Sequence, residues 1–96
     1  MIIDCHTHLY TDRPIEAVLA LADRVGIDKI FVSHTLAISY DMQEGNQVVA
    51  EAVKRYPDRV FGYVAVSSAR YGQVAIDELI RGVEKYGLHG LKLVHR

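Results

Sequence analysis

The sequence has 96 residues, 50% hydrophobic and 24% charged, which suits one small domain with an apolar core. The net charge of −1 and the lack of a lysine and arginine cluster argue against a nucleic-acid partner. A single cysteine excludes an intrachain disulfide, and the sequence shows neither a signal peptide nor an apolar run of about 20 residues, so we expect a cytoplasmic protein without a membrane partner.

Four short apolar runs are predicted to be strands. They are rich in β-branched and aromatic residues, and the middle two are nearly continuous rather than alternating, as in strands buried on both faces of a parallel sheet. The runs are Met1–Cys5, Lys29–Ser33, Val60–Val66 and Gly90–Val94. They begin about 30 residues apart, which is the length of one βα unit.

Three helices are predicted between these strands. The first lies between Pro14 and Gly26, the second ends before Pro57, and the third is closed by Gly87. Apolar residues at helical spacing define their buried faces: Ile15, Val18, Leu19, Ala22 and Val25; Val48, Val49, Ala52, Val53 and Tyr56; and Ile76, Leu79, Ile80 and Val83.

The order β-α-β-α-β-α-β predicts an α/β fold with a parallel sheet and right-handed crossovers. Two architectures fit: a complete four-stranded α/β sandwich, or half of an eight-stranded barrel, which needs about 250 residues. No helix follows the fourth strand to cover it, and this favours the half-barrel. We therefore expect residues 1–96 to be the N-terminal half of a (β/α)8 TIM barrel.

The clearest chemical motif is Asp4-Cys5-His6-Thr7-His8 at the end of the first strand. Alternation would place Asp4, His6 and His8 on one face, and two imidazoles about 7 Å apart along the backbone can converge on one ion. Asp4 is a candidate to orient a histidine, and Cys5 would be packed on the other face. The alternative is a strand whose histidines merely alternate, although ionisable residues rarely face an interior without a partner or a task.

Three further histidines are candidate ligands. His34 follows the second strand and would reach the same rim, but a simple loop histidine is the preferred interpretation. His89 precedes the fourth strand and belongs to the opposite end of the barrel, whereas His95 lies at the correct end. Catalytic zinc usually takes three protein ligands, so His6 and His8 alone do not complete a site.

Lys92 lies inside the apolar fourth strand. In one interpretation, it binds an anionic substrate or carries a carbamate that bridges to a second metal. In the other, it reaches out to solvent at the end of the strand. A long loop is predicted after the second strand. Within it, Asp41, Glu44 and Asn46 are candidates to contact substrate, although a helix cap is the simpler interpretation of Asn46. Tyr40 is interpreted either as lining the mouth or as packing on the surface.

The sequence resembles the amidohydrolase-related family of (β/α)8 barrels, which includes metal-dependent hydrolases and nonoxidative decarboxylases. The segments that carry the resemblance are Ile2-Ile3-Asp4-Cys5-His6-Thr7-His8, Gly26-Ile27-Asp28-Lys29, Asn46 to Phe61 with its Tyr-Pro-Asp-Arg end, and Tyr86 to Leu93. The resemblance implies a divalent metal, commonly zinc, held by His6 and His8. It also implies further histidines from the fifth and sixth strands and an aspartate general base from the eighth, none of which this chain contains.

The expected function is metal-dependent hydrolysis or decarboxylation of a small carboxylate-bearing or cyclic substrate, with the 96-residue chain alone close to inactive. Homo-oligomers or a complementary half-barrel are the expected protein partners, because a half-barrel exposes two sheet edges. One alternative is a histidinol-phosphatase-like phosphoesterase, in which His34 would be a ligand. The other is a nonenzymatic half-barrel module.

Overall fold

The computed structural model describes residues 1–67 and 72–93 and contains one four-stranded sheet. All strands run parallel in the order β1-β2-β3-β4, as predicted. Their bounds are Ile3–Leu9 for β1, Lys29–His34 for β2, Val60–Val66 for β3 and Gly90–Leu93 for β4. The predicted strand residue Val94 and the candidate ligand His95 lie outside the described residues.

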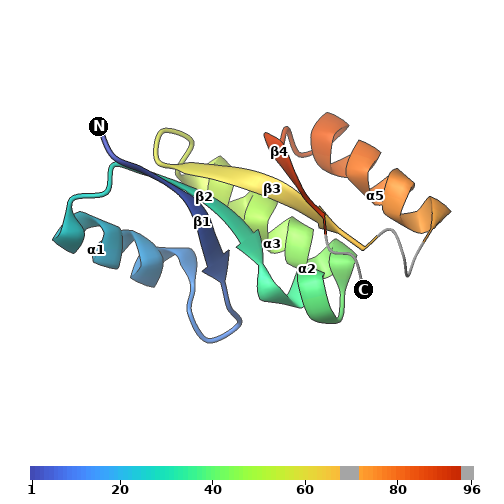
Figure 1. Ribbon diagram of the computed structural model, residues 1–96, viewed down its shortest axis with the longest axis horizontal. Helices are drawn as coiled ribbons and strands as arrows, with labels where there is room; N and C mark the ends of the chain where they lie inside the picture. The colour runs from blue at the N-terminus through green and yellow to red at the C-terminus, as the bar shows by residue number, and fades with distance from the viewer. Residues whose placement is uncertain (68–71, 94–96) are drawn as a thin grey trace.

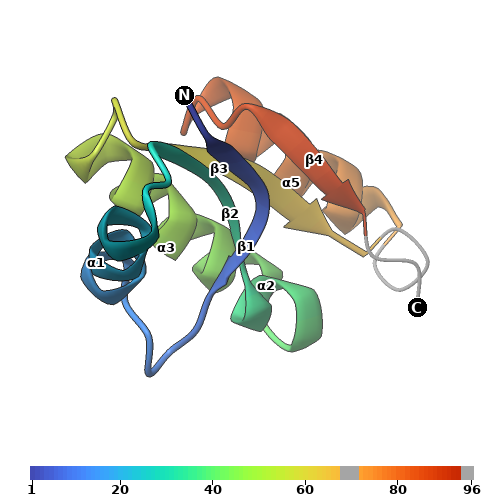
Figure 2. The same ribbon diagram turned by 60° about the vertical axis from the view of Figure 1, so that its left-hand side comes forward.

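The helices are α1 (Ile15–Val25), α2 (Thr35–Ser39), α3 (Met42–Arg55) and α5 (Gln73–Glu84). Sequential parallel strands joined by right-handed crossovers place the long helices on one face of the sheet, and this is the arrangement seen in Figures 1 and 2. We call the opposite side the open face. No described helix covers it, and it carries Lys29, Phe31, Phe61, Tyr63 and Lys92, all half-buried.

The core lies between the sheet and the helices. Alternate residues of β2 and β3, such as Ile30, Val32, Val60 and Val64, are at most 2% exposed and pack against the buried sides of α1 and α3. In α1 the predicted positions Ile15, Val18, Leu19 and Ala22 are buried, whereas Val25 is exposed. Gly26 has φ 80° at the end of α1, so its lack of a side chain permits the left-handed turn that leads into β2.

The prediction for α5 was correct in position but wrong in orientation. Ile76, Ile80 and Val83 are about half exposed, and the buried residues are Ala75, Glu78 and Gly82. A Cβ atom at position 82 would lie 2.4 Å from Val64 Cγ2, so the glycine allows α5 to approach β3 closely. Of the predicted stripe, Leu79 packs against the core, and the other three residues face away from this sheet.

The segment after β2 was predicted to be a long loop, but it forms α2 and the start of α3. Asp41 caps α3 by accepting a hydrogen bond from the Glu44 amide at 3.0 Å. Asn46 was predicted to cap this helix, and that prediction was wrong. It lies inside α3 and is fully buried. Tyr40 is 81% exposed at the end of α2.

Asn46 completes the sheet where β2 no longer pairs with β3. The β2–β3 register ends at Val32 and Gly62. Beyond it, the Asn46 side chain donates to the Ala65 carbonyl at 3.0 Å and accepts from the Ala65 amide at 2.9 Å, as a neighbouring strand would. Its amide also donates to Glu78 at 2.8 Å. Glu78 is in turn paired with Arg81, so α3, β3 and α5 share one buried polar network.

Candidate metal centre

His6 and His8 converge on the open face at the carboxyl end of β1. Their Nε2 atoms are 3.1 Å apart, and their rings meet edge to face. Two nitrogens about 2.05 Å from one ion would be roughly 2.9 Å apart at octahedral corners and roughly 3.3 Å apart at tetrahedral corners. The observed separation lies between these values, so the pair fits a divalent ion. Without an ion, the same distance is a hydrogen bond between the rings.

The pair reaches the open face through a β-bulge in β1. Asp4 pairs with Ile30 and Thr7 pairs with Val32, so three steps along β1 match two steps along β2. Such an extra residue reverses the alternation of the side chains that follow it. Asp4 therefore shares the helix side with Ile30, while His8, which pairs with Ser33, lies on the open face.

The bulge corrects two expectations for this strand. Asp4 does not share a face with the histidines, and its carboxylate contacts neither ring. It accepts the His6 backbone N–H at 2.9 Å and the Thr7 hydroxyl at 2.7 Å, and these hydrogen bonds lower the pKa of Asp4. Cys5 is exposed rather than packed.

Ser33 orients His8, and this role was not predicted. Its Oγ lies 3.0 Å from Nδ1 of His8, which leaves Nε2 to face His6. A contact of this kind fixes the ring orientation of a metal-binding histidine. The only sequence signal was a small polar residue in the apolar run of β2. Burial, followed by the nearby charges of His6 and Lys92, lowers the pKa of His8, which favours the neutral imidazole that binds metal.

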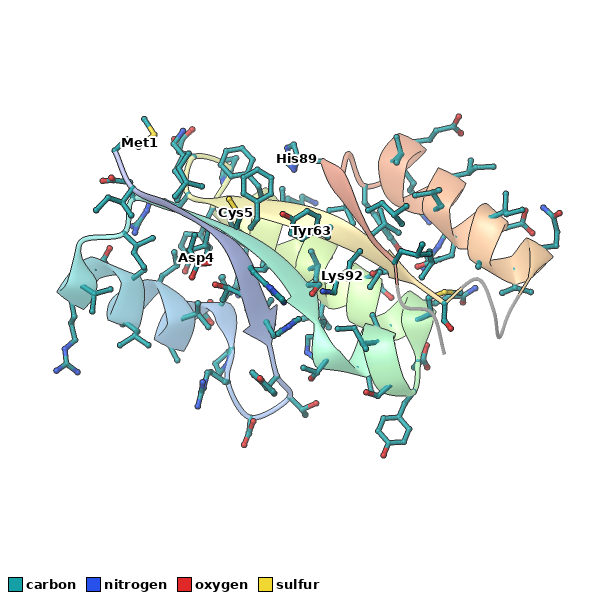
Figure 3. The ribbon with its side chains drawn as sticks, viewed as in Figure 1. Met1, Asp4, Cys5, Tyr63, His89 and Lys92 are labelled. Carbon is teal, nitrogen blue, oxygen red and sulfur yellow. The ribbon has the colours of Figure 1, made fainter. Side chains whose placement is uncertain are left out.

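Lys92 lies on the same face as the histidine pair. Its register partner is Ala65, two residues beyond Tyr63, and Figure 3 shows its side chain on the open face. Within residues 1–67 and 72–93, no carboxylate pairs with Lys92. Its positive charge is close enough to depress the pKa of His8. The open face therefore has an imidazole pair and a lysine near the carboxyl ends of the strands.

The structure keeps His34 away from this pair. His34 pairs with Leu9, whereas His8 pairs with the preceding residue, so His34 points to the helix side. It is 3% exposed, and its Nδ1 accepts the Leu36 amide at 2.9 Å to cap α2. Burial lowers the pKa of His34. It is thus a buried capping residue rather than the loop histidine that we had expected.

His89 lies at the amino end of β4, as predicted. Its ring packs 4.9 Å from that of Phe61, and its Nδ1 accepts the Gly62 amide at 3.3 Å. Figure 3 shows His89 far from Lys92 along the open face. The described part of the chain has no group of three or more histidine, cysteine or carboxylate side chains arranged to hold an ion. Within the described residues, no third side chain of these kinds joins His6 and His8.

No protein-family model and no curated protein matches this sequence. Solved structures do match its fold. A 2,6-dihydroxybenzoate decarboxylase from Rhizobium has a TM-score of 0.76 and 18% identity, over 94% of this chain and 37% of that one. A 2,6-dihydroxybenzoate decarboxylase in complex with 2,6-dihydroxybenzoate also matches, with a TM-score of 0.76 and 19% identity.

Two further structures are similar. A 5-carboxyvanillate decarboxylase from Novosphingobium aromaticivorans, with bound manganese and a nitrobenzoic acid, has a TM-score of 0.67 and 18% identity over 97% of this chain and 41% of that one. A Staphylococcus aureus protein assigned as an amidohydrolase has a TM-score of 0.70 and 15% identity over 94% and 36%. The chain thus spans about two fifths of the length of these structures.

No described helix is long and apolar enough to cross a bilayer. The matches and the strand order together confirm the predicted fold, the N-terminal half of a (β/α)8 barrel.

Proposed function

We propose that this chain forms the N-terminal half of a metal-dependent hydrolase or nonoxidative decarboxylase of the amidohydrolase type, with His6 and His8 as the first two metal ligands. The observation that carries the proposal is the 3.1 Å approach of their Nε2 atoms on the open face. This is the carboxyl end of the strands, where barrel enzymes place their chemistry. Zinc is the expected ion, and manganese or iron would also accept imidazole ligands.

Each described residue of the site has a defined role in this proposal. His6 and His8 hold the ion, and Ser33 fixes the His8 ring through Nδ1. A bound divalent ion supplies Lewis acidity toward a carbonyl or carboxylate oxygen of the substrate. Lys92 provides a positive charge on the same face that no described carboxylate neutralises.

The substrate class follows from this arrangement. A lysine and an ion on one face attract an anion, which supports a small carboxylate-bearing substrate. The similar fold of a decarboxylase of 2,6-dihydroxybenzoate supports a cyclic one. A catalytic zinc site normally has three protein ligands, and the chain brings two together. We therefore expect residues 1–96 alone to have little activity and to need the remaining barrel strands.

The structure weakens the phosphoesterase alternative, which requires His34 as a ligand. The side chain of His34 lies on the helix side and caps α2 through Nδ1. A nonenzymatic half-barrel module remains the contrasting class. It predicts that His6 and His8 form only a hydrogen-bonded pair and that the chain does not bind zinc.

Zinc titration by calorimetry distinguishes these classes. The wild-type chain should bind about one equivalent, and the His6→Ala and His8→Ala variants should each lose binding. His89→Ala is the matched control, because it removes an imidazole from the opposite end of the same face and should leave the affinity unchanged. Equal binding by all four proteins, or no binding by the wild type, would overturn the proposal.

A further inference from the structure

One peptide group in the bulge of β1 is held from both sides of the sheet. Cys5 and His6 have no register partner in β2, because the register passes from Asp4 directly to Thr7. The N–H and C=O of the peptide that joins them therefore need other partners, as in any bulge. The His6 N–H donates to Asp4 Oδ1 at 2.9 Å, and the Cys5 carbonyl accepts the Tyr63 hydroxyl at 2.9 Å.

The two partners lie on opposite faces of the sheet. Asp4 is on the helix side with Ile30, and Tyr63 is on the open face with Phe31, whose ring centroid is 5.5 Å away. In a trans peptide the N–H and C=O point in opposite directions, so these contacts hold the peptide plane across the sheet. Figure 3 shows Tyr63 and Cys5 side by side, although β2 separates their strands.

The orientation of this peptide determines where the His6 side chain points. His6 is exposed, and its ring contacts His8 but has no other described hydrogen-bond partner. His8, in contrast, is also held by Ser33. The backbone at position 6 must therefore orient the His6 ring, as Ser33 orients the His8 ring.

The geometry points to Tyr63 and Asp4 as positioning residues that clamp the Cys5–His6 peptide and so hold the His6 imidazole against His8. Tyr63 is on β3, two strands away from the ligand pair, and no motif in the sequence distinguished it. The consequence for metal affinity rests on the proposed function, whereas the consequence for the backbone at His6 does not.

Two measurements on the same variants test the clamp. The first is hydrogen exchange of the His6 amide by NMR in the metal-free chain, and the second is zinc affinity. Tyr63→Phe removes only the hydroxyl, and Tyr40→Phe, at an 81% exposed position, is its matched control. Asp4→Ala removes the other side of the clamp, whereas Asp4→Asn keeps an oxygen that accepts the His6 N–H. Circular dichroism and urea unfolding verify that each variant folds.

We expect Tyr63→Phe and Asp4→Ala to speed exchange of the His6 amide about tenfold and to weaken zinc binding roughly 10-fold or more. Tyr40→Phe and Asp4→Asn should behave much as the wild type does. If zinc binds but all variants bind and exchange like the wild type, the clamp is wrong and the proposed function stands. If the wild type binds no zinc, the proposed function fails, and the exchange rates alone decide: unchanged rates overturn the clamp, and faster rates in the two disruptive variants support it.

Discussion

Replacing Asn46 should destabilise the chain more than any surface change in α3. Asn46→Ala removes two hydrogen bonds to the Ala65 backbone and one to the Glu78 carboxylate, all in a fully buried setting. Neutral hydrogen bonds contribute about 1 kcal/mol each and one to a charged group about 2 kcal/mol, and the partners left behind lack replacements. We therefore expect the free energy of unfolding to fall by about 3–5 kcal/mol, against a total of about 5–15 kcal/mol for a typical domain.

Urea unfolding followed by circular dichroism measures this loss. Gln47→Ala is the control, since Gln47 is the exposed neighbour on the same helix, and it should change stability by less than about 0.5 kcal/mol. The network also fixes Ala65, the register partner of Lys92, so its loss should disturb the open face as well. A decrease of less than about 1 kcal/mol for Asn46→Ala would refute the strand-like role of this side chain.

Three further predictions concern single residues. Ser33→Ala should weaken zinc binding about 10- to 100-fold in calorimetry, because His8 loses the contact that orients its ring. Since burial lowers the pKa of His34, the unfolded chain takes up its proton at higher pH than the folded chain. The free energy of unfolding should therefore fall as pH drops below about 6.5. It should fall less steeply in His34→Asn, which keeps a capping oxygen. Equal slopes for the two proteins in urea titrations across pH would contradict this. Gly82→Ala should lower stability by about 1–3 kcal/mol in thermal unfolding, because its Cβ would meet Val64, and a neutral result would show that α5 can shift.

Much of the fold could be predicted from the sequence because its signals are local. Gly26 and the Tyr56-Pro57 pair mark the ends of two helices through backbone conformation alone, and both ends are observed. The two central apolar runs form strands over nearly the predicted ranges. The sequence also predicted that His6 and His8 share a face, and their Nε2 atoms are 3.1 Å apart.

The features that were missed depend on contacts between distant residues. The bulge places Asp4 on the opposite face from His8, although the sequence pattern alternates regularly. The bulge depends on the pairing of β1 with β2 and on the contact from Tyr63 on β3. The role of Asn46 depends on a gap beside β3 that no local pattern reveals. In α5 the small residue Gly82 selects the packed side, although the hydrophobic pattern favours another.

The central claim is that His6 and His8 bind one ion together. The most direct measurement is anomalous diffraction at the zinc edge from crystals of the chain grown with zinc. The account predicts one peak about 2.0–2.1 Å from the Nε2 atoms of both His6 and His8. An absent peak, or a peak at His34 or His89 instead, would contradict it.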